Sequence, residues 1–199
     1  MNVVAPERLD AATGSHTAGV AARRFAATNE ACDIFFRSNA EPIAQACRAM
    51  AIRFQKGGRL LVAGDGVQRS DVSHTVVEFV HPVVVGKRAL PAMPLAGVTG
   101  IAALRSLVTF GRSRDIVLLL HAGPAGELDV QLLSQSTERG MLTLLLTGPK
   151  NNHALPAADH HFAVESRDPC IVQETHEMLY HVLWELVHVF FDHRAVRDS

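Results

Sequence analysis

Apolar residues recur along this chain in two patterns, and each pattern covers a different part of it. From 16 to about 55 they return at helical intervals, in an alanine-rich stretch whose only proline is Pro42. Because proline suits the first turn of a helix, the pattern predicts two helices, broken near 38–40, with Glu41 and Pro42 opening the second. Residues 1–15 show no periodicity, and we expect them to form a flexible arm.

In the rest of the chain, short apolar runs alternate with segments of helical spacing. The apolar runs, each short enough for a buried strand, cover 60–63, 92–96, 116–121, 142–147 and 162–164. The segments of helical spacing cover 70–81, 97–110, 127–140 and 169–191. Since a crossover helix has to pack back onto its sheet, this alternation predicts an α/β fold, with five parallel strands in a flavodoxin-like α/β/α sandwich.

Together the two patterns predict a single domain over 16–199, made of a helical pair at 16–57 and a sandwich at 58–199. At 199 residues and 21.5 kDa the chain is long enough for one full core and short for two. The helical pair carries apolar residues outside the sandwich. We expect this surface to be buried against a partner subunit, in a homodimer or homotetramer.

Composition and charge narrow the choice of compartment and partner. The formal net charge of -1 gives no reason to expect nucleic acid or an acidic membrane surface as a partner. No apolar run reaches membrane-spanning length, and the first residues lack the regions of a signal peptide. The three cysteines are widely spaced without a C-x-x-C pair, which favours reduced thiols over disulfides. We therefore expect a soluble cytoplasmic protein.

The first apolar run of the sandwich leads into a glycine turn and then into a helix. Strand, glycine turn and helix together form an arrangement that α/β proteins use to present backbone N–H groups to an anionic ligand. Ser70 or Asp71 is expected to cap the first turn of the helix. His74 and Glu78 follow four residues apart, so both side chains leave the same face and can share a metal ion or a proton, or form an ordinary exposed pair.

The last helix, over 169–191, is apolar around most of its circumference and yet carries a ladder of polar residues. Gln173, Glu177 and His181 follow at intervals of four. Polar groups on a buried helix are costly unless they satisfy one another or hold a ligand, and both outcomes are open for this ladder. His176 and His188 on the same helix are interpreted as interface or surface residues.

Several short motifs occur together in a characteristic order. They are the G-x-G turn followed by D-x-x-H-x-x-x-E, the run A-L-P-A at 89–92, the strand R-D-I-V-L-L-L, R-G-M-x-T-x-x-L-T-G at 139–148, and D-P-x-x-x-Q-E-x-H on the last helix. In this order and spacing the chain resembles sugar-isomerase (SIS) domains, and within them the bacterial phosphoheptose isomerases. The resemblance covers nearly the whole chain and implies the α/β/α sandwich and a homotetramer with active sites at subunit junctions.

The resemblance also implies a catalytic centre, often built around zinc or a similar divalent metal, from His74, Glu78, Gln173 and His181. By this resemblance Glu78 is the base that moves a proton between C1 and C2 of a sugar phosphate, and His181 is its acid partner. His74 and Gln173 complete the metal shell. Ligand-binding positions in the same interpretation are Gly64, Asp65, Gly66, Gln68, Arg69, His121, Gly123 and Asp168.

The phosphate-binding segments of this chain depart from the family pattern. Gln68 replaces a serine, and the second phosphate loop, S-T-S-G-N-S in the family, is here L-H-A-G-P-A at 120–125. All four hydroxyls of that pattern are therefore missing, and Pro124 removes a backbone donor as well. His121 is a possible new ligand or acid in this loop, and Arg69, Arg105, Arg112 or Arg114 are possible replacements for the phosphate contacts.

The catalytic residue types match the family, whereas the phosphate-binding segments do not. Two functions of different class follow from this difference. The four site residue types favour a divergent metal-dependent isomerase acting on a sugar phosphate or a similar small molecule. The altered loop favours a non-catalytic assembly or regulatory protein with a protein partner, like the SIS proteins that bind a replication initiator.

Overall fold

The structure is a computed structural model, and it describes residues 11–64, 66–82, 84–95, 100–123, 126–149 and 158–195. Its elements are α1 (Ala11–Gln55), β1 (Leu60–Gly64), the 3-10 turn η1 (Gly66–Gln68), α2 (Arg69–Val80), β2 (Ala92–Pro94), α3 (Gly100–Phe110), β3 (Ile116–Leu120), α4 (Glu127–Glu138), β4 (Leu142–Thr147), β5 (His160–Ala163) and α5 (Pro169–Ala195). The five predicted strands and the four predicted sandwich helices are thus confirmed, with shifts of a few residues at their ends. No helix in the described part of the chain is both long and apolar enough to cross a membrane.

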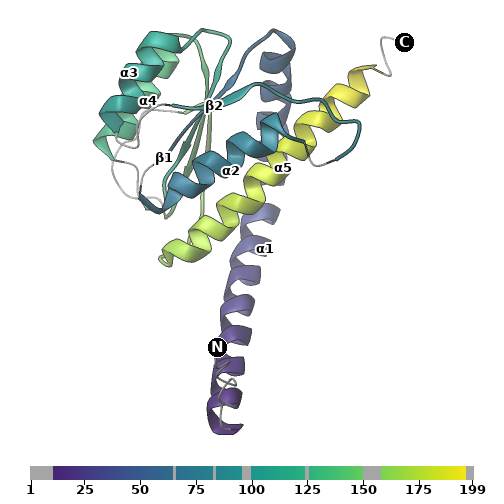
Figure 1. The fold of residues 1–199 in the computed structure, drawn as a ribbon, viewed down its shortest axis with the longest axis vertical. Helices are drawn as coiled ribbons and strands as arrows, with labels where there is room; N and C mark the ends of the chain where they lie inside the picture. Colours follow the sequence, from purple (N-terminus) through teal and green to yellow (C-terminus); the bar gives the residue numbers. More distant parts are fainter. Residues whose placement is uncertain are drawn as a thin grey trace, which may run out of the picture.

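All five strands run parallel, in the order β2-β1-β3-β4-β5. Figure 1 shows α3 and α4 on one face of this sheet and α1, α2 and α5 on the other. The α/β/α sandwich predicted from the alternation of apolar runs is therefore confirmed. The direction of strand order changes between β1 and β3, where open α/β sheets bind ligands beyond the carboxyl ends of their strands.

Alternate strand residues form two separate cores. The residues that face α1, α2 and α5 are Leu60, Val62, Ile116, Leu118, Leu120, Leu142, Leu144 and Leu146. The residues that face α3 and α4 are Leu61, Ala63, Val117, Leu119 and Leu145. Strands buried on both faces need continuous apolar runs, which explains why these segments were readable as strands in the sequence.

The predicted N-terminal helical pair is wrong, because residues Ala11–Gln55 form one helix that passes through Pro42. Proline has no backbone N–H, so the helix lacks the hydrogen bond that residue 42 would otherwise donate to the carbonyl of Ser38. Phe35 and Ile43, on either side of the proline, are both buried in the same core. Burial on both sides therefore keeps the helix continuous. Helix α1 begins at Ala11, within the segment predicted to be a flexible arm. Residues 1–10 of that segment lie outside the described part of the chain.

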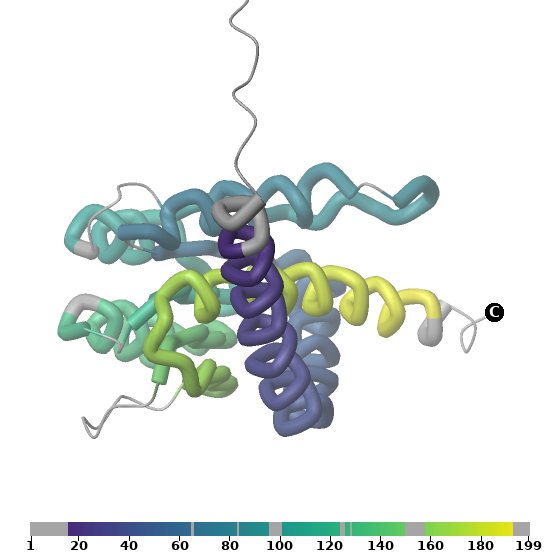
Figure 2. Tube along the Cα trace, turned by 90° about the horizontal axis from the view of Figure 1, so that it is seen from below, coloured from purple at the N-terminus to yellow at the C-terminus, as the bar shows by residue number. Residues whose placement is uncertain are grey.

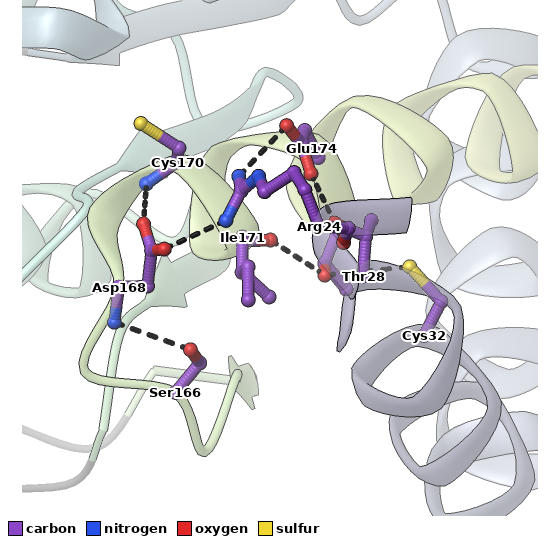
Figure 3. A network of polar contacts seen from close by, with 9 residues as sticks. Arg24, Thr28, Cys32, Ser166, Asp168, Cys170, Ile171 and Glu174 are labelled. Carbon is purple, nitrogen blue, oxygen red and sulfur yellow. Dashed lines mark hydrogen bonds and ion pairs between the residues drawn. The ribbon is translucent and has the colours of Figure 1, made fainter. Parts of the chain in front are cut away.

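Helix α1 crosses α5, and its N-terminal half extends beyond the body of the sandwich (Figures 1 and 2). Arg24 links the two helices by ion pairs to Asp168 (2.6 Å) and Glu174 (2.9 Å), as Figure 3 shows. Thr28 donates a further hydrogen bond to Glu174 (2.6 Å). These contacts fix the N-terminal end of α5, which carries half of the candidate site.

Two local predictions on the site helices are also corrected. Neither Ser70 nor Asp71 caps α2, whose N-cap is Gln68 without a side-chain capping bond. Ser70 donates instead to the carbonyl of Val67, and Asp71 accepts a hydrogen bond from Gln173 on α5. His176 and His188 are fully buried and not at the surface. His188 Nδ1 lies 2.8 Å from the carbonyl oxygen of Trp184 and Nε2 lies 3.1 Å from that of Arg88, and acceptors of this kind allow an imidazole to be buried.

Candidate functional site

Helices α2 and α5, far apart in sequence, bring three ligand-type side chains together. His74 and Glu78 lie on one face of α2, and His181 reaches them from α5. His74 Nε2 lies 3.4 Å from His181 Nε2 and 3.5 Å from Glu78 Oε1, and His181 Nε2 lies 3.7 Å from the same Oε1. One nitrogen or oxygen of each residue falls within 4.8 Å of the others. The predicted convergence of the two helices is therefore present for these three residues.

The separation of these atoms suits a divalent ion. With Zn–N bonds of about 2.0–2.1 Å, tetrahedral geometry places ligand atoms about 3.3 Å apart, close to the three spacings observed here. Two imidazole nitrogens at 3.4 Å can hydrogen-bond only when one of them carries a proton. If both present a lone pair, a cation between them is needed. The donor set of two imidazoles and one carboxylate, with the Glu78 side chain only 15% exposed, fits zinc or a similar ion.

Gln173, the fourth residue of the expected centre, lies nearer to the N-terminal end of α2. Its Nε2 donates to Asp71 Oδ1 (3.3 Å) and approaches Ser70 Oγ (3.4 Å). The side-chain oxygen of Gln173 makes no hydrogen bond to any residue that the structure describes. Burial raises the pKa of Asp71, and the bond from Gln173 opposes that shift.

Two residues beside His74 were missed as site residues in the sequence. Tyr180 places its hydroxyl 2.8 Å from His74 Nδ1, and Glu177 Oε1 lies 3.4 Å from the same nitrogen. Glu177 is a member of the polar ladder, so the sequence held a signal for it. Tyr180 is fully buried and lies in an apolar stretch of the sequence, where a tyrosine is interpreted as a residue of the hydrophobic core. Burial, Glu177 and other nearby carboxylates raise the pKa of Tyr180, so its hydroxyl stays protonated.

The first glycine turn is explained by packing and backbone geometry. A side chain at Gly64 would come 3.0 Å from Val72 and 3.1 Å from the carbonyl oxygen of Leu120. Gly66 has a φ of +58°, a left-handed conformation that favours glycine. Asp65 lies outside the described residues. Arg69 is exposed beside this turn.

Gln68, at the position where the family resemblance implies a serine, is fully buried beneath the turn. Its Oε1 contacts His176 Nδ1 (3.4 Å), and His176 Nε2 contacts the carbonyl of Thr147 (3.2 Å). The amide nitrogen of Gln68 has no hydrogen-bond partner among the described residues. Burial lowers the pKa of His176 to about 4, so its imidazole is neutral near pH 7. This replacement therefore brings no positive charge to the turn.

The altered second loop forms an imidazole–carboxylate pair with the first turn of α4. His121 Nδ1 lies 3.3 Å from Asp129 Oδ2, and the same oxygen accepts the backbone N–H of Gly126 (2.8 Å) at the start of α4. Gly123 accepts a bond from Gly148 N–H (3.1 Å), which joins the ends of β3 and β4. The 124–125 segment lies outside the described residues. A carboxylate of the chain therefore occupies the helix end that would otherwise attract an anion.

Asp168 lies at the N-terminal end of α5 and is engaged by the protein. Its Oδ1 accepts the backbone N–H of Cys170 (2.9 Å), and its Oδ2 pairs with Arg24 (Figure 3). The bond from Cys170 and the charge of Arg24 lower the pKa of Asp168. The expected ligand-binding role of Asp168 stays a prediction.

The order of the five parallel strands and the helices that cover both faces of the sheet define the class of α/β sandwich proteins. Within that class, the chain is 30% identical over 165 residues to the phosphoheptose isomerase of Thermodesulfovibrio yellowstonii, covering 77% of this chain and 82% of the relative. The chain therefore belongs to the phosphoheptose isomerase family.

Two solved structures share the fold. The phosphoheptose isomerase of Francisella tularensis matches with a TM-score of 0.75 and 21% identity, over 86% of this chain and 97% of the other. The phosphoheptose isomerase of Neisseria gonorrhoeae matches with a TM-score of 0.73 and 19% identity, over 86% and 99%. No protein-family model matches the chain.

Proposed function

We propose that this protein is a metal-dependent aldose–ketose isomerase whose reaction centre lies between α2 and α5. The observation that carries the proposal is the approach of His74, Glu78 and His181 to within 3.4–3.7 Å of one another. A simple surface pair would need only the two residues on α2. Bringing a second imidazole to them from α5 places three ligand atoms where one small ion or one substrate oxygen can contact all of them.

The residues of this centre have distinct tasks in the proposed reaction. Glu78, the least exposed of the three, removes the proton from C1 of the ketose and returns it to C2 of the aldose product. His181 handles the proton of the neighbouring oxygen. His74 and Gln173 would help to hold a divalent ion. The side-chain oxygen of Gln173 would be the fourth ligand atom. A divalent ion, when bound, polarises the carbonyl and stabilises the enediolate.

The substrate of the proposed reaction differs from the substrate of a typical relative at the end that the phosphate-binding loops would hold. The family name points to a sugar phosphate, but this chain lacks the loop hydroxyls and places Asp129 at the start of α4. Each charge-assisted hydrogen bond to a phosphate contributes about 1.5–3 kcal/mol, so losing several weakens phosphate binding by orders of magnitude. We therefore propose a divergent substrate, a weakly held sugar phosphate or a related small sugar.

Isotope exchange tests this function directly. In D2O, the purified zinc-loaded protein should convert a ketose substrate such as sedoheptulose 7-phosphate, or an unphosphorylated sugar from a panel, into an aldose carrying deuterium at C2. Metal analysis should find about one ion per centre, and His74→Ala should lose it. Absence of both metal and turnover on every sugar tested would contradict the proposal.

A non-catalytic assembly or regulatory role is the second candidate. The observation that favours it is the altered loop, whose His121 pairs with Asp129 at the start of α4. Under this function the protein would bind a protein partner and show neither turnover nor a melting-temperature shift with sugar phosphates.

We also propose that α1 assembles the protein into a homodimer or homotetramer. Phe25 is 69% exposed and Ile34 57% exposed on α1. Such apolar residues are stabilised when they are buried against a second copy. Phe25→Asp should reduce the mass measured by light scattering to that of a smaller species, and an unchanged mass would contradict this interface.

A further inference from the structure

The imidazole of His74 contacts two different groups of side chains through its two nitrogens. Nε2 faces Glu78 and His181 on the metal-binding side. Nδ1, on the opposite side of the ring, lies 2.8 Å from the hydroxyl of Tyr180 and 3.4 Å from Glu177 Oε1. Both of these residues lie on α5, so the same helix that supplies His181 also holds the far side of His74.

The contacts on Nδ1 decide which nitrogen is free to bind an ion. A neutral imidazole carries its proton on one nitrogen and a lone pair on the other, and only the lone pair binds a metal. A hydroxyl can either donate to Nδ1 or accept from it. The carboxylate of Glu177 can only accept. The two oxygens together therefore favour a proton on Nδ1 and a lone pair on Nε2.

We propose that Tyr180 and Glu177 are positioning residues that hold His74 in this tautomer and orientation for ion binding through Nε2. The inference rests on the proposed metal centre for its purpose. It assigns a task to two residues of α5 that have no part in the proposed catalytic roles.

The packing of Tyr180 fits this task. The Tyr180 side chain is fully buried, and its ring meets His74 and His181 edge-to-face, with centroid distances of 5.2 Å and 5.0 Å. A buried ring flanked in this way has little freedom, so its hydroxyl is a fixed point for Nδ1. Glu177 is partly exposed and supplies the charge that the hydroxyl lacks.

Titration of the metal-free protein with Zn2+ and Co2+ tests the proposal. Tyr180→Phe keeps the ring and removes only the hydroxyl, and Glu177→Gln removes the acceptor-only character at almost unchanged size. Loss of an outer partner of a metal-bound histidine weakens metal affinity by about 10- to 100-fold, and we expect this range for each variant. The visible spectrum of bound Co2+ should change in intensity or position, because it reports the ligand geometry. Glu185→Gln, an equal loss of charge at an exposed position further along α5, is the matched control.

The outcomes separate this proposal from the proposed function. Weaker binding in Tyr180→Phe and Glu177→Gln, with wild-type affinity in Glu185→Gln and melting temperatures within a few degrees, supports the positioning role. Wild-type affinity and an unchanged Co2+ spectrum in both site variants overturn it while leaving the metal centre intact. A wild-type protein that binds neither ion overturns the metal centre and the positioning role together.

Discussion

The two ends of the candidate active site differ in how their polar groups are used. Between α2 and α5, His74, Glu78 and His181 point their ligand atoms at one another within 3.4–3.7 Å, in a spacing that suits a shared ion. At the carboxyl edge of the sheet, Asp129 accepts the N–H of Gly126 and pairs with His121, so a carboxylate of the chain already uses the start of α4.

Under the proposed function, this difference means that the chemical step and the anchoring of the substrate can diverge separately in one fold. The reaction centre depends on two helices fixed by a common core, and changes there disturb burial as well as chemistry. The anchoring groups lie on the turns that follow β1 and β3, where substitutions leave the sheet intact. A family member can therefore keep its proton-transfer groups while it changes what it binds.

The largest expected effect comes from removing the base at the reaction centre. Glu78→Gln keeps the size of the side chain and removes its capacity to accept a proton, so we expect isomerisation to slow by about 100- to 10,000-fold. The rate of deuterium incorporation from D2O measures this. Glu185→Gln should retain the wild-type rate, and equal rates in both variants would remove Glu78 from the mechanism.

The next largest effect concerns stability on the anchoring side. His176 has an ordinary pKa of 6.5 when unfolded and about 4 when buried, so the unfolded state binds more protons between these values. The contribution of His176 to the free energy of unfolding is therefore fully present above pH 6.5. It is lost as the pH falls toward 4, and the loss is at most about 3 kcal/mol. Urea unfolding at several pH values should show this slope in the wild type. In His176→Gln the slope should be flatter, and an identical slope would argue against the buried neutral imidazole.

A smaller effect is expected from restoring anion binding at the second loop. Asp129→Asn keeps an oxygen for the N–H of Gly126 and removes the negative charge at the start of α4. We expect calorimetry to show about tenfold tighter binding of a sugar phosphate, equivalent to about 1.4 kcal/mol of repulsion removed. Glu127→Gln, at the neighbouring exposed first position of α4, controls for the change in net charge. Equal gains in both variants would mean that Asp129 does not meet the ligand's anion.

The smallest effect should come from the ion pairs that join α1 to α5. Arg24, Asp168 and Glu174 are all partly exposed, so Arg24→Ala should lower the melting temperature only slightly. Because salt screens exposed charges, the difference from wild type should shrink at high ionic strength. A large, salt-independent loss would show that Arg24 acts through packing.

The sandwich could be predicted from the sequence because its strands are defined by residues that are adjacent in the chain. Strands buried on both faces require continuous apolar runs, and the runs at β1, β3 and β4 stand out between polar turns. The continuity of α1 was not readable, since Pro42 is a local signal for a helix start. What overrides it is the burial of Phe35 and Ile43 in one core, which depends on the tertiary structure.

The candidate site was readable only in part for the same reason. Spacing along α2 predicted that His74 and Glu78 share a face, and the family resemblance added His181 from α5. The partners of His74 Nδ1 were not readable, because whether Tyr180 contributes a core ring or a hydroxyl depends on which residue of α2 it meets. The position of Gln173 opposite Asp71 likewise follows from how the two helices align.

The most direct test of the central claim is an anomalous diffraction map at the zinc absorption edge, from crystals of the metal-loaded protein. We expect a peak between α2 and α5, at about 2.0–2.2 Å from His74 Nε2, a Glu78 oxygen and His181 Nε2. Metal-saturated crystals with no peak between these three side chains would contradict the proposed reaction centre.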